Sequence, residues 1–143
     1  MKAEVPLQQQ MKFVIERLCF SVVCLLTIFP VNASAQITPD GTLPTVVEEQ
    51  ENMEKITGGE REGNNLFHSF EEFSIPEGIE AIFENGLDVE NIFTRITGES
   101  ASTINGILKT QGGANFFLIN PNGIVFGENA QLDVGGIIYR YYG

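Results

Sequence analysis

The sequence predicts an all-β protein, and two observations point to this class. From Leu66 onward, short apolar or alternating runs follow one another, separated by turn signals such as Asn85-Gly86 and Gly112-Gly113. Runs of this length between Gly, Pro and Asn are typical of strands. In addition, no window keeps the apolar spacing of an amphipathic helix over three turns.

Residues 1–35 are predicted to be a signal peptide. Lys12 and Arg17 precede an apolar run over residues 18–29, and Ala33 and Ala35 supply an Ala-x-Ala cleavage site. The run is shorter than the roughly 20 apolar residues that a membrane-spanning helix needs. We therefore expect export by the general secretion machinery and cleavage after Ala35. An uncleaved anchor and an acylated lipoprotein are the alternatives, and either Met1 or Met11 can be the start.

Charge and cysteine content exclude several classes of function. The whole chain carries a net charge of −11, and residues 1–35 hold three bases and two acids, so the remainder carries −12. Such a surface does not suit nucleic acid, whose phosphates require clustered Lys and Arg. Both cysteines, Cys19 and Cys24, lie in the signal peptide, which excludes a disulfide scaffold and a thiol site in the rest. The acidic residues are spread out, so we expect no metal and no cofactor.

Three further segments follow the signal peptide. Residues 36–62 are predicted to form an acidic, turn-rich segment and cap in which only Thr45-Val46-Val47 resembles a strand. Residues 63–136 contain the strand-like runs, and residues 137–143 are expected to be an atypical tail of the kind a gene fragment or a frameshift would leave. The runs cover residues 66–70, 73–75, 81–83, 92–96, 104–108, 116–119, 124–126 and 131–134.

A weak internal echo leaves two all-β architectures open. Asn105-Gly106 and Asn122-Gly123 each precede an isoleucine, 17 residues apart (122 − 105). A repeat of about 20 residues with Asn/Gly corners is what the coils of a parallel β-helix would show. Asn-Gly is also the commonest hairpin turn, which would suit a sandwich of hairpins. The residues by themselves do not decide between the two.

One segment, Leu118 to Gly127, carries the most information. It predicts a strand, then a turn in which Pro fixes φ and Asn-Gly supplies a positive φ, then a second strand. Together with other segments in the same order, it resembles the two-partner secretion domain, also called the haemagglutination-activity domain, of filamentous-haemagglutinin-like exoproteins. The resemblance covers roughly residues 37 to 136, and its main segments are residues 63–70, 73–75, 91–98, 102–106, 117–127 and 132–136.

The resemblance implies both a fold and a role. The fold is a right-handed parallel β-helix (a solenoid) with an N-terminal cap, here expected to be truncated at the C-terminal end. The role is that of a secreted, non-enzymatic module that reaches the cell surface or the medium through the periplasm. There the periplasmic domains of a TpsB-type outer-membrane β-barrel transporter would recognise it. The resemblance also implies that such a module is the start of an adhesin, in which regions beyond this domain bind a host or cell-surface ligand.

The candidate site is the motif Asn120, Pro121, Asn122, Gly123 and Ile124. It can serve as the surface that the transporter recognises, or as a structural corner of the solenoid, since both uses need the same residues.

Asn105, Gly106 and His68 form a secondary motif. His68 shares a strand face with Leu66 and Phe70, and no cysteine or second histidine follows the signal peptide. We therefore expect a packed or capping histidine and not a catalytic base.

Two other functions remain as alternatives: a non-functional remnant of such a gene, and a secreted carbohydrate-active β-helix enzyme. Glycosidase chemistry needs a pair of carboxyl groups. The adjacent Glu71 and Glu72 are expected to point to opposite faces of a strand, and so not to form that pair. The phenylalanines are expected to stack in the core.

Overall fold

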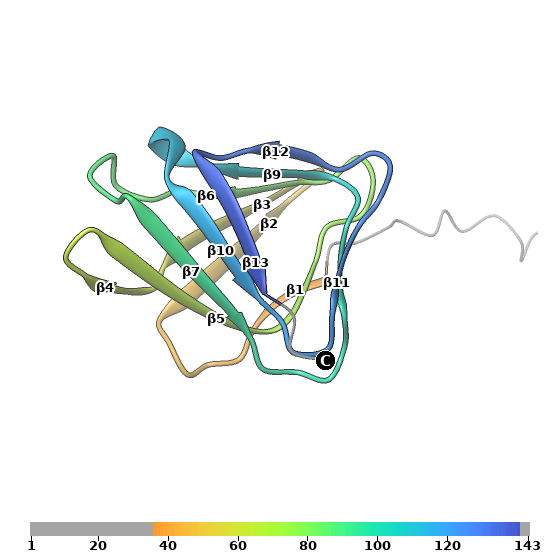
Figure 1. Ribbon diagram of the computed structural model, residues 1–143, viewed down its shortest axis with the longest axis horizontal. Coiled ribbons are helices and arrows are strands. Elements are labelled where there is room, and N and C mark those ends of the chain that lie inside the picture. The colour runs from red at the N-terminus through yellow and green to blue at the C-terminus, as the bar shows by residue number, and fades with distance from the viewer. Residues whose placement is uncertain (1–35, 141–143) are drawn as a thin grey trace, which may run out of the picture. The chain divides into compact units, whose positions relative to one another are not determined.

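The computed structural model describes residues 36–140, and this part of the chain is almost entirely β-structure (Figure 1). The predicted signal peptide (residues 1–35), with its predicted cleavage residues Ala33 and Ala35, and residues 141–143 lie outside the described residues. No helix in the described part is long and apolar enough to span a membrane. The strands are β1 (Gln36–Pro39), β2 (Thr45–Gln50), β3 (Met53–Gly58), β4 (Glu60–Glu62), β5 (Asn65–Ser74), β6 (Glu80–Phe83), β7 (Asn91–Ile96), β8 (Ser102–Ile104), β9 (Ile107–Thr110), β10 (Asn115–Ile119), β11 (Ile124–Phe126), β12 (Gln131–Asp133) and β13 (Gly136–Arg140).

These strands form three sheets, which Figure 1 shows as the three sides of a prism. The first sheet has the order β1-β5-β7-β10-β13, with β4 also paired to β5. The second has the order β12-β9-β6-β3-β2, and the third consists of β11 and β8. Because successive strands of the chain pass from one sheet to the next, each circuit of the chain lies on the previous one.

The pairing within the first sheet defines the coils. Asn65 lies beside Asn91, Asn91 beside Asn115, and Asn115 beside Gly136, all in parallel strands. One coil therefore takes 26 residues (91 − 65), the next 24 (115 − 91) and the next 21 (136 − 115). The parallel β-helix that the resemblance implied is confirmed, and the sandwich of hairpins is excluded. A right-handed coil is the hand that such crossovers prefer.

The internal echo, however, does not mark one coil of the solenoid. Asn105-Gly106 lies at the corner between β8 and β9, whereas Asn122-Gly123 lies at the corner between β10 and β11. The residue above Asn105 is Gly127, whose amide bonds the carbonyl of Ile104 at 2.8 Å. Asn-Gly recurs here because both corners need tight turns, and not because the two corners stack.

The N-terminal cap contains more strands than the sequence indicated. Residues 36–62 hold four strands, β1 to β4, where only residues 45–47 were expected. β1 and β4 each pair antiparallel with β5, and β2 pairs antiparallel with β3. Polar residues dominate these strands since one side of a cap faces solvent. Antiparallel pairing at this end covers the edge of the first parallel coil.

Residues 137–140, expected to be part of an atypical tail, instead continue the solenoid. β13 pairs in parallel with β10 over its whole length, with Phe116 beside Ile137 and Leu118 beside Tyr139. The consecutive apolar residues Ile137, Ile138 and Tyr139 lie beside the apolar residues Phe116, Phe117 and Leu118 of β10, which favours the addition of this strand.

The core consists of inward-facing side chains from all three sheets. The large side chains that are fully buried include Phe70, Phe73, Phe83, Phe116, Ile56, Ile75, Ile92, Ile96, Ile104, Leu108 and Leu118.

The expectation that the phenylalanines stack in the core holds only for the inward ones. Phe67, Phe93 and Phe117 form a second stack on the outer face of the first sheet, with ring centroids 5.1 and 4.4 Å apart. This outer stack lies at positions that alternate with the buried ones along β5, β7 and β10.

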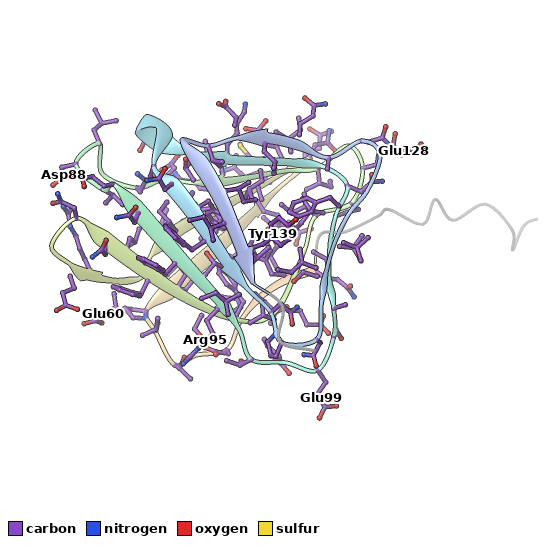
Figure 2. All side chains as sticks on the ribbon, viewed as in Figure 1. Glu60, Asp88, Arg95, Glu99, Glu128 and Tyr139 are labelled. Carbon is purple, nitrogen blue, oxygen red and sulfur yellow. The ribbon has the colours of Figure 1, made fainter. Side chains whose placement is uncertain are left out.

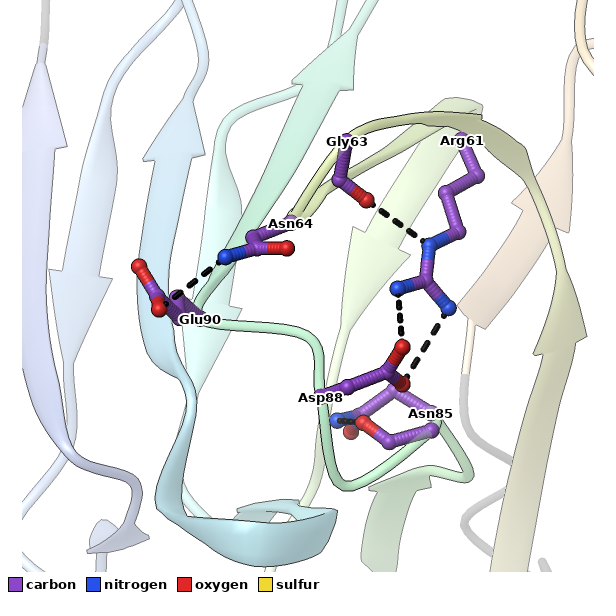
Figure 3. Close-up of polar contacts among 7 residues, drawn as sticks. Arg61, Gly63, Asn64, Asn85, Asp88 and Glu90 are labelled. Atoms are coloured by element: carbon purple, nitrogen blue, oxygen red, sulfur yellow. Dashed lines mark hydrogen bonds and ion pairs between the residues drawn. The ribbon is translucent and has the colours of Figure 1, made fainter.

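Loops at one end of the coils are joined by polar contacts (Figure 3). Arg61 of β4 forms an ion pair with Asp88, and its Nε donates to the carbonyl of Gly63 at 2.9 Å. Asn64 donates to Glu90 at 3.0 Å. These contacts fix the β4–β5 hairpin against the loop that leads into β7.

Candidate recognition site

The motif Asn120–Ile124 forms the corner between β10 and β11. Inside the corner, the Asn122 amide donates to Asn120 Oδ1 at 2.8 Å and the Gly123 amide donates to the Asn120 carbonyl at 3.3 Å. Gly123 has φ 117°, a backbone conformation that side-chain-bearing residues rarely adopt. Asn, Pro and Gly at these positions thus produce a tight turn with its own backbone bonds.

The corner is also bonded to the coil beneath it. Asn120 Nδ2 donates to the Ser100 carbonyl at 3.0 Å and to Ser102 Oγ at 2.9 Å. Asn122 Nδ2 donates to the Gly98 carbonyl at 2.7 Å. The motif therefore stacks on residues 98–102, which form the corresponding corner one coil earlier.

Burial divides the motif into an anchor and a surface. Asn120 is fully buried, with 0% of its surface exposed. Pro121 and Asn122 are exposed, while Gly123 and Ile124 are half-buried. The structure thus brings the five residues together in one corner, where a buried amide holds two exposed residues in a fixed position.

An acidic depression of about 660 Å³ adjoins this corner. Its lining includes Gly98 and Ser100, on which the motif rests, and four carboxylates: Asp40, Glu71, Glu72 and Glu99. None of these four forms an ion pair with a Lys or Arg of the described chain. The surface beside the motif is therefore negatively charged and is complementary to a positively charged partner.

The position of Glu71 and Glu72 differs from the expectation. Both line the depression, whereas adjacent strand residues were expected to point to opposite faces. The reason is a register shift in the β1–β5 pairing: Thr38 lies beside Glu72 and Pro39 beside Phe70, so Glu71 is skipped. A β-bulge of this kind turns two consecutive side chains toward solvent.

Asp40 is the centre of a hydrogen-bond network that sequence reasoning missed. Its carboxylate accepts from Ser69 Oγ at 2.6 Å, from Thr97 Oγ1 at 2.8 Å, and from the amide and hydroxyl of Thr42. Arg95 donates to Ser69 and Thr42 as well. We define these five residues as the clasp, because they join the N-terminal cap to two successive coils.

The clasp changes the acidity of Asp40. Partial burial by itself would raise the pKa of this carboxyl, but hydrogen bonds from Ser69, Thr42 and Thr97 outweigh burial and hold the pKa well below its usual value. Asp40 is therefore ionised at neutral pH. In the sequence, Asp40 stands between Pro39 and Gly41, a local turn signal, and its partners Ser69 and Thr97 lie 29 and 57 residues away.

The secondary motif contributes to a different corner. Asn105 Oδ1 accepts from the Asn129 amide at 3.0 Å, and the amides of Asn105 and Gly106 both donate to the carbonyl of Ile75. A side chain on Gly106 would clash with the carbonyls of Pro76 and Ile79. These residues lie at the corner between β8 and β9, so they are not part of the Asn120–Ile124 corner.

His68 is packed inside the first coil. It is 2% exposed, its Nδ1 lies 3.1 Å from Thr45 Oγ1, and its ring lies edge-on to Phe83 at 5.2 Å. Burial lowers the pKa of His68 to about 4. A neutral, enclosed imidazole with a threonine partner joins cap to core and lacks the access that a catalytic base needs.

Chemistry at the site is limited by its side chains. Among residues 36–140, no group of three or more His, Cys, Asp and Glu side chains is placed to hold a metal ion. The groups gathered around the motif are amides, hydroxyls and carboxylates. Such a set can present a rigid, charged surface to another macromolecule.

Fold and site together define a β-solenoid module with stacked parallel coils, a capped N-terminal end and a rigid corner beside an acidic surface. The model of the TPS secretion domain family matches residues 35–139, and the chain belongs to this two-partner secretion family. A comparison with curated proteins found no match. As a family member, the chain is the secretion module of an exoprotein whose partner is a TpsB-type outer-membrane transporter and whose destination is extracellular or the cell surface.

Proposed function

We propose that the periplasmic domains of the transporter recognise this chain through the corner Asn120–Ile124. The observation that carries the proposal is the division of the motif: buried Asn120 fixes the corner, and Pro121 and Asn122 are presented to solvent. A rigid exposed turn loses little conformational entropy when a partner binds it. The module acts without catalysis and starts an exoprotein of the filamentous-haemagglutinin type, in which later regions carry adhesion.

The negative charge beside the corner also supports recognition by the transporter, through a basic surface on its periplasmic domains. The acidic depression lies against Gly98 and Ser100, one coil below the motif, and its carboxylates lack cationic partners in the described chain. Long-range attraction to a basic surface would speed encounter in the periplasm and would weaken with salt. Recognition in this form needs no cofactor.

The test combines binding and secretion. The full chain is expressed with its transporter in a Gram-negative host, and the amount in the medium is measured. Chain recovered from the periplasm is titrated with the transporter's purified periplasmic domains. Pro121→Arg and Asn122→Arg should lower both binding and secretion, because they add bulk and positive charge to the corner. Val125→Arg is the matched control, since Val125 is 56% exposed on the neighbouring strand β11.

Two results would overturn the proposal. If the wild-type chain neither binds the periplasmic domains nor reaches the medium, the chain does not work as a secretion module. If the wild type binds and both corner variants bind equally well, the corner is structural only and recognition lies elsewhere.

A further inference from the structure

Three Asn-Gly sequences lie in the described part of the chain, at Asn85, Asn105 and Asn122. Asparagine is a thermolabile residue, and a following glycine makes it more reactive. Because glycine has no side chain to shield its backbone nitrogen, that nitrogen can reach the side-chain carbonyl carbon (Cγ) of the asparagine before it. The three sequences lie in three different connections, between β6 and β7, between β8 and β9, and between β10 and β11. They differ in how firmly each is held.

The reaction open to such a pair consumes only water. The glycine nitrogen gives its proton to solvent base and attacks Cγ, so that an N–Cγ bond forms. The Cγ–Nδ2 bond breaks, and ammonia leaves after taking a proton from solvent. Water then opens the five-membered succinimide ring. Opening at Cγ gives aspartate, and opening at the main-chain carbonyl carbon gives isoaspartate, whose main chain runs through the side-chain carbons. One amide is thus exchanged for one carboxylate, with no oxidation or reduction.

Asn85 is fixed at both ends of its side-chain amide. Its Nδ2 donates to the Gln111 carbonyl at 2.9 Å, and its Oδ1 accepts from the Gln111 amide at 3.0 Å. Only 4% of the residue is exposed. Attack by the Gly86 nitrogen requires the side chain to turn, which breaks both bonds to Gln111. Asn85 therefore reacts only when this connection opens locally.

Asn105 is protected through the glycine that follows it. Gly106 is buried and its amide donates to the Ile75 carbonyl at 3.0 Å, so its nitrogen is both bonded and shielded from base. Asn105 Oδ1 accepts from the Asn129 amide at 3.0 Å. The Asn105 side chain also packs so closely on Gly127 that no Cβ would fit there. Reaction at Asn105 likewise requires local opening.

Asn122 and Gly123 are the least restrained of the three pairs. Asn122 is exposed, and its bond from Nδ2 to the Gly98 carbonyl at 2.7 Å lies at the surface, where water can replace it. The Gly123 amide donates to the Asn120 carbonyl at 3.3 Å, which is longer than the usual N–H···O distance of about 2.9 Å. Both reacting groups can therefore be freed without opening the coil.

We propose that Asn122 is a self-modification site: in the folded chain its amide is converted to aspartate and isoaspartate, while Asn85 and Asn105 keep their amides. No transporter takes part in this reaction, so the site goes beyond the proposed function. Each event adds one negative charge to the chain. The corner between β10 and β11 therefore has a limited chemical lifetime.

The modification releases the exposed half of the corner from the coil beneath it. The new carboxylate has no hydrogen to donate to the Gly98 carbonyl, and Gly98 itself lines the acidic depression. Glu99, a carboxylate of that depression, lies at the same corner (Figure 2). Isoaspartate also lengthens the main chain of the turn. Asn120 keeps its bonds to Ser100 and Ser102, so the buried anchor stays in place.

The test follows the three asparagines in the purified, folded full chain during incubation at neutral and mildly alkaline pH. Samples are digested with pepsin in acid, and mass spectrometry measures aspartate and isoaspartate at each position. Asn122 should be modified at least about tenfold faster than Asn85 and Asn105, which have to wait for local opening. In concentrated guanidinium chloride the three rates should agree within about fivefold, since an unfolded chain keeps only fluctuating local structure.

Two variants identify the source of the ammonia. Asn122→Gln should abolish most of the ammonia release from the folded chain, because a glutamine would have to form a less favourable six-membered ring. Asn129→Gln is the matched control: Asn129 is exposed but is followed by alanine, so ammonia release should stay at the wild-type level.

Release of the corner is measured by hydrogen exchange on Asn122→Asp, which reproduces one product. The Ser102 amide, which donates to the Gly123 carbonyl at 3.0 Å, should exchange faster than in wild type. The Asn105 amide, which donates to the Ile75 carbonyl at 2.7 Å, is the internal control and should be unchanged.

Two results would overturn the site. If Asn122 stays intact in the folded chain over a time in which the unfolded chain is modified, the corner protects it. If Asn85 or Asn105 reacts as fast as Asn122 in the folded chain, the contacts described above do not select the site. Unchanged exchange of the Ser102 amide in Asn122→Asp would show that the new charge does not release the corner. The rate comparison uses the wild-type chain, so it does not depend on the folding of any variant.

Discussion

Asn120 donates a 2.9 Å hydrogen bond from its buried amide to the hydroxyl of Ser102, in the coil beneath. Ser102 is itself 1% exposed. The same amide nitrogen reaches the Ser100 carbonyl, and the amide oxygen accepts from Asn122. One side chain therefore bonds three groups of two neighbouring corners, of which the Ser102 hydroxyl is buried, so Asn120 is the structural anchor of the motif.

Replacing Asn120 should destabilise the solenoid strongly. Asn120→Ala removes all three hydrogen bonds and leaves the buried Ser102 hydroxyl without this partner, which costs about 2–4 kcal/mol in the free energy of unfolding. Asn122→Ala, on an exposed side chain with one bond to Gly98, should cost about 0.5–1 kcal/mol. Urea denaturation of both variants measures the difference. Equal midpoints for the two would show that the anchor role of Asn120 is wrong.

Stability should fall as the pH drops below 6.5, because His68 is buried in its neutral form. The folded pKa of about 4 lies below the unfolded value of 6.5, so the unfolded chain binds the extra proton between these values. The contribution is fully present above pH 6.5 and is lost as pH falls toward 4, amounting to about 3 kcal/mol. Burial raises the pKa of Glu54 and acts in the opposite sense. The contribution of His68 is therefore obtained from the difference in unfolding free energy between wild type and a His68 variant at each pH.

His68→Gln keeps a group that can bond Thr45 and removes the titration. Unfolding free energies of wild type and His68→Gln, measured from pH 7 to pH 5, should converge as the pH falls. Parallel curves would mean that His68 is not held neutral by burial.

The sequence was sufficient for the all-β class, because short runs and turn residues are local signals. Coil boundaries were not predictable from the Asn-Gly echo, since the coils shorten from 26 to 21 residues and equivalent corners do not keep a constant spacing. In Phe116-Phe117, both residues are apolar, yet only Phe116 points into the core. Alternation cannot identify the inward one when both are phenylalanine.

The candidate site was predictable only where its residues are contiguous in the sequence, because only local signals can be read there. The motif Asn120–Ile124 is contiguous, so its turn chemistry could be inferred directly. The clasp around Asp40 is made by residues from three separate segments, and the bulge at Glu71 arises from pairing with β1. Neither the clasp nor the bulge leaves a local signal in the sequence.

Removing the Asp40 carboxylate should loosen the N-terminal cap. Asp40→Ala deletes the acceptor for Ser69, Thr42 and Thr97, and we expect a loss of about 1–3 kcal/mol at pH 7. The folded pKa of Asp40 is depressed below the unfolded value of 3.8. Its contribution is therefore present above pH 3.8 and is lost as pH falls through the folded pKa.

Denaturation at pH 7 and near pH 2.5 should show the gap between wild type and Asp40→Ala narrowing with acid. Glu128→Ala, on an exposed loop glutamate (Figure 2), is the control and should leave stability unchanged at both pH values. A gap that stays constant would mean that the clasp does not depend on the charge of Asp40.

The inner and outer aromatic stacks should respond differently to truncation. Phe83 is 1% exposed and contacts the rings of Phe116, Phe73 and His68, so Phe83→Ala should cost about 3–5 kcal/mol through the cavity that it leaves. Phe93 lies on the solvent side between Phe67 and Phe117, where water can fill the space, and Phe93→Ala should cost about 1–2 kcal/mol. Chemical denaturation compares the two. If Phe93→Ala proved as costly as Phe83→Ala, the outer stack would contribute to the free energy of unfolding as much as the buried rings do.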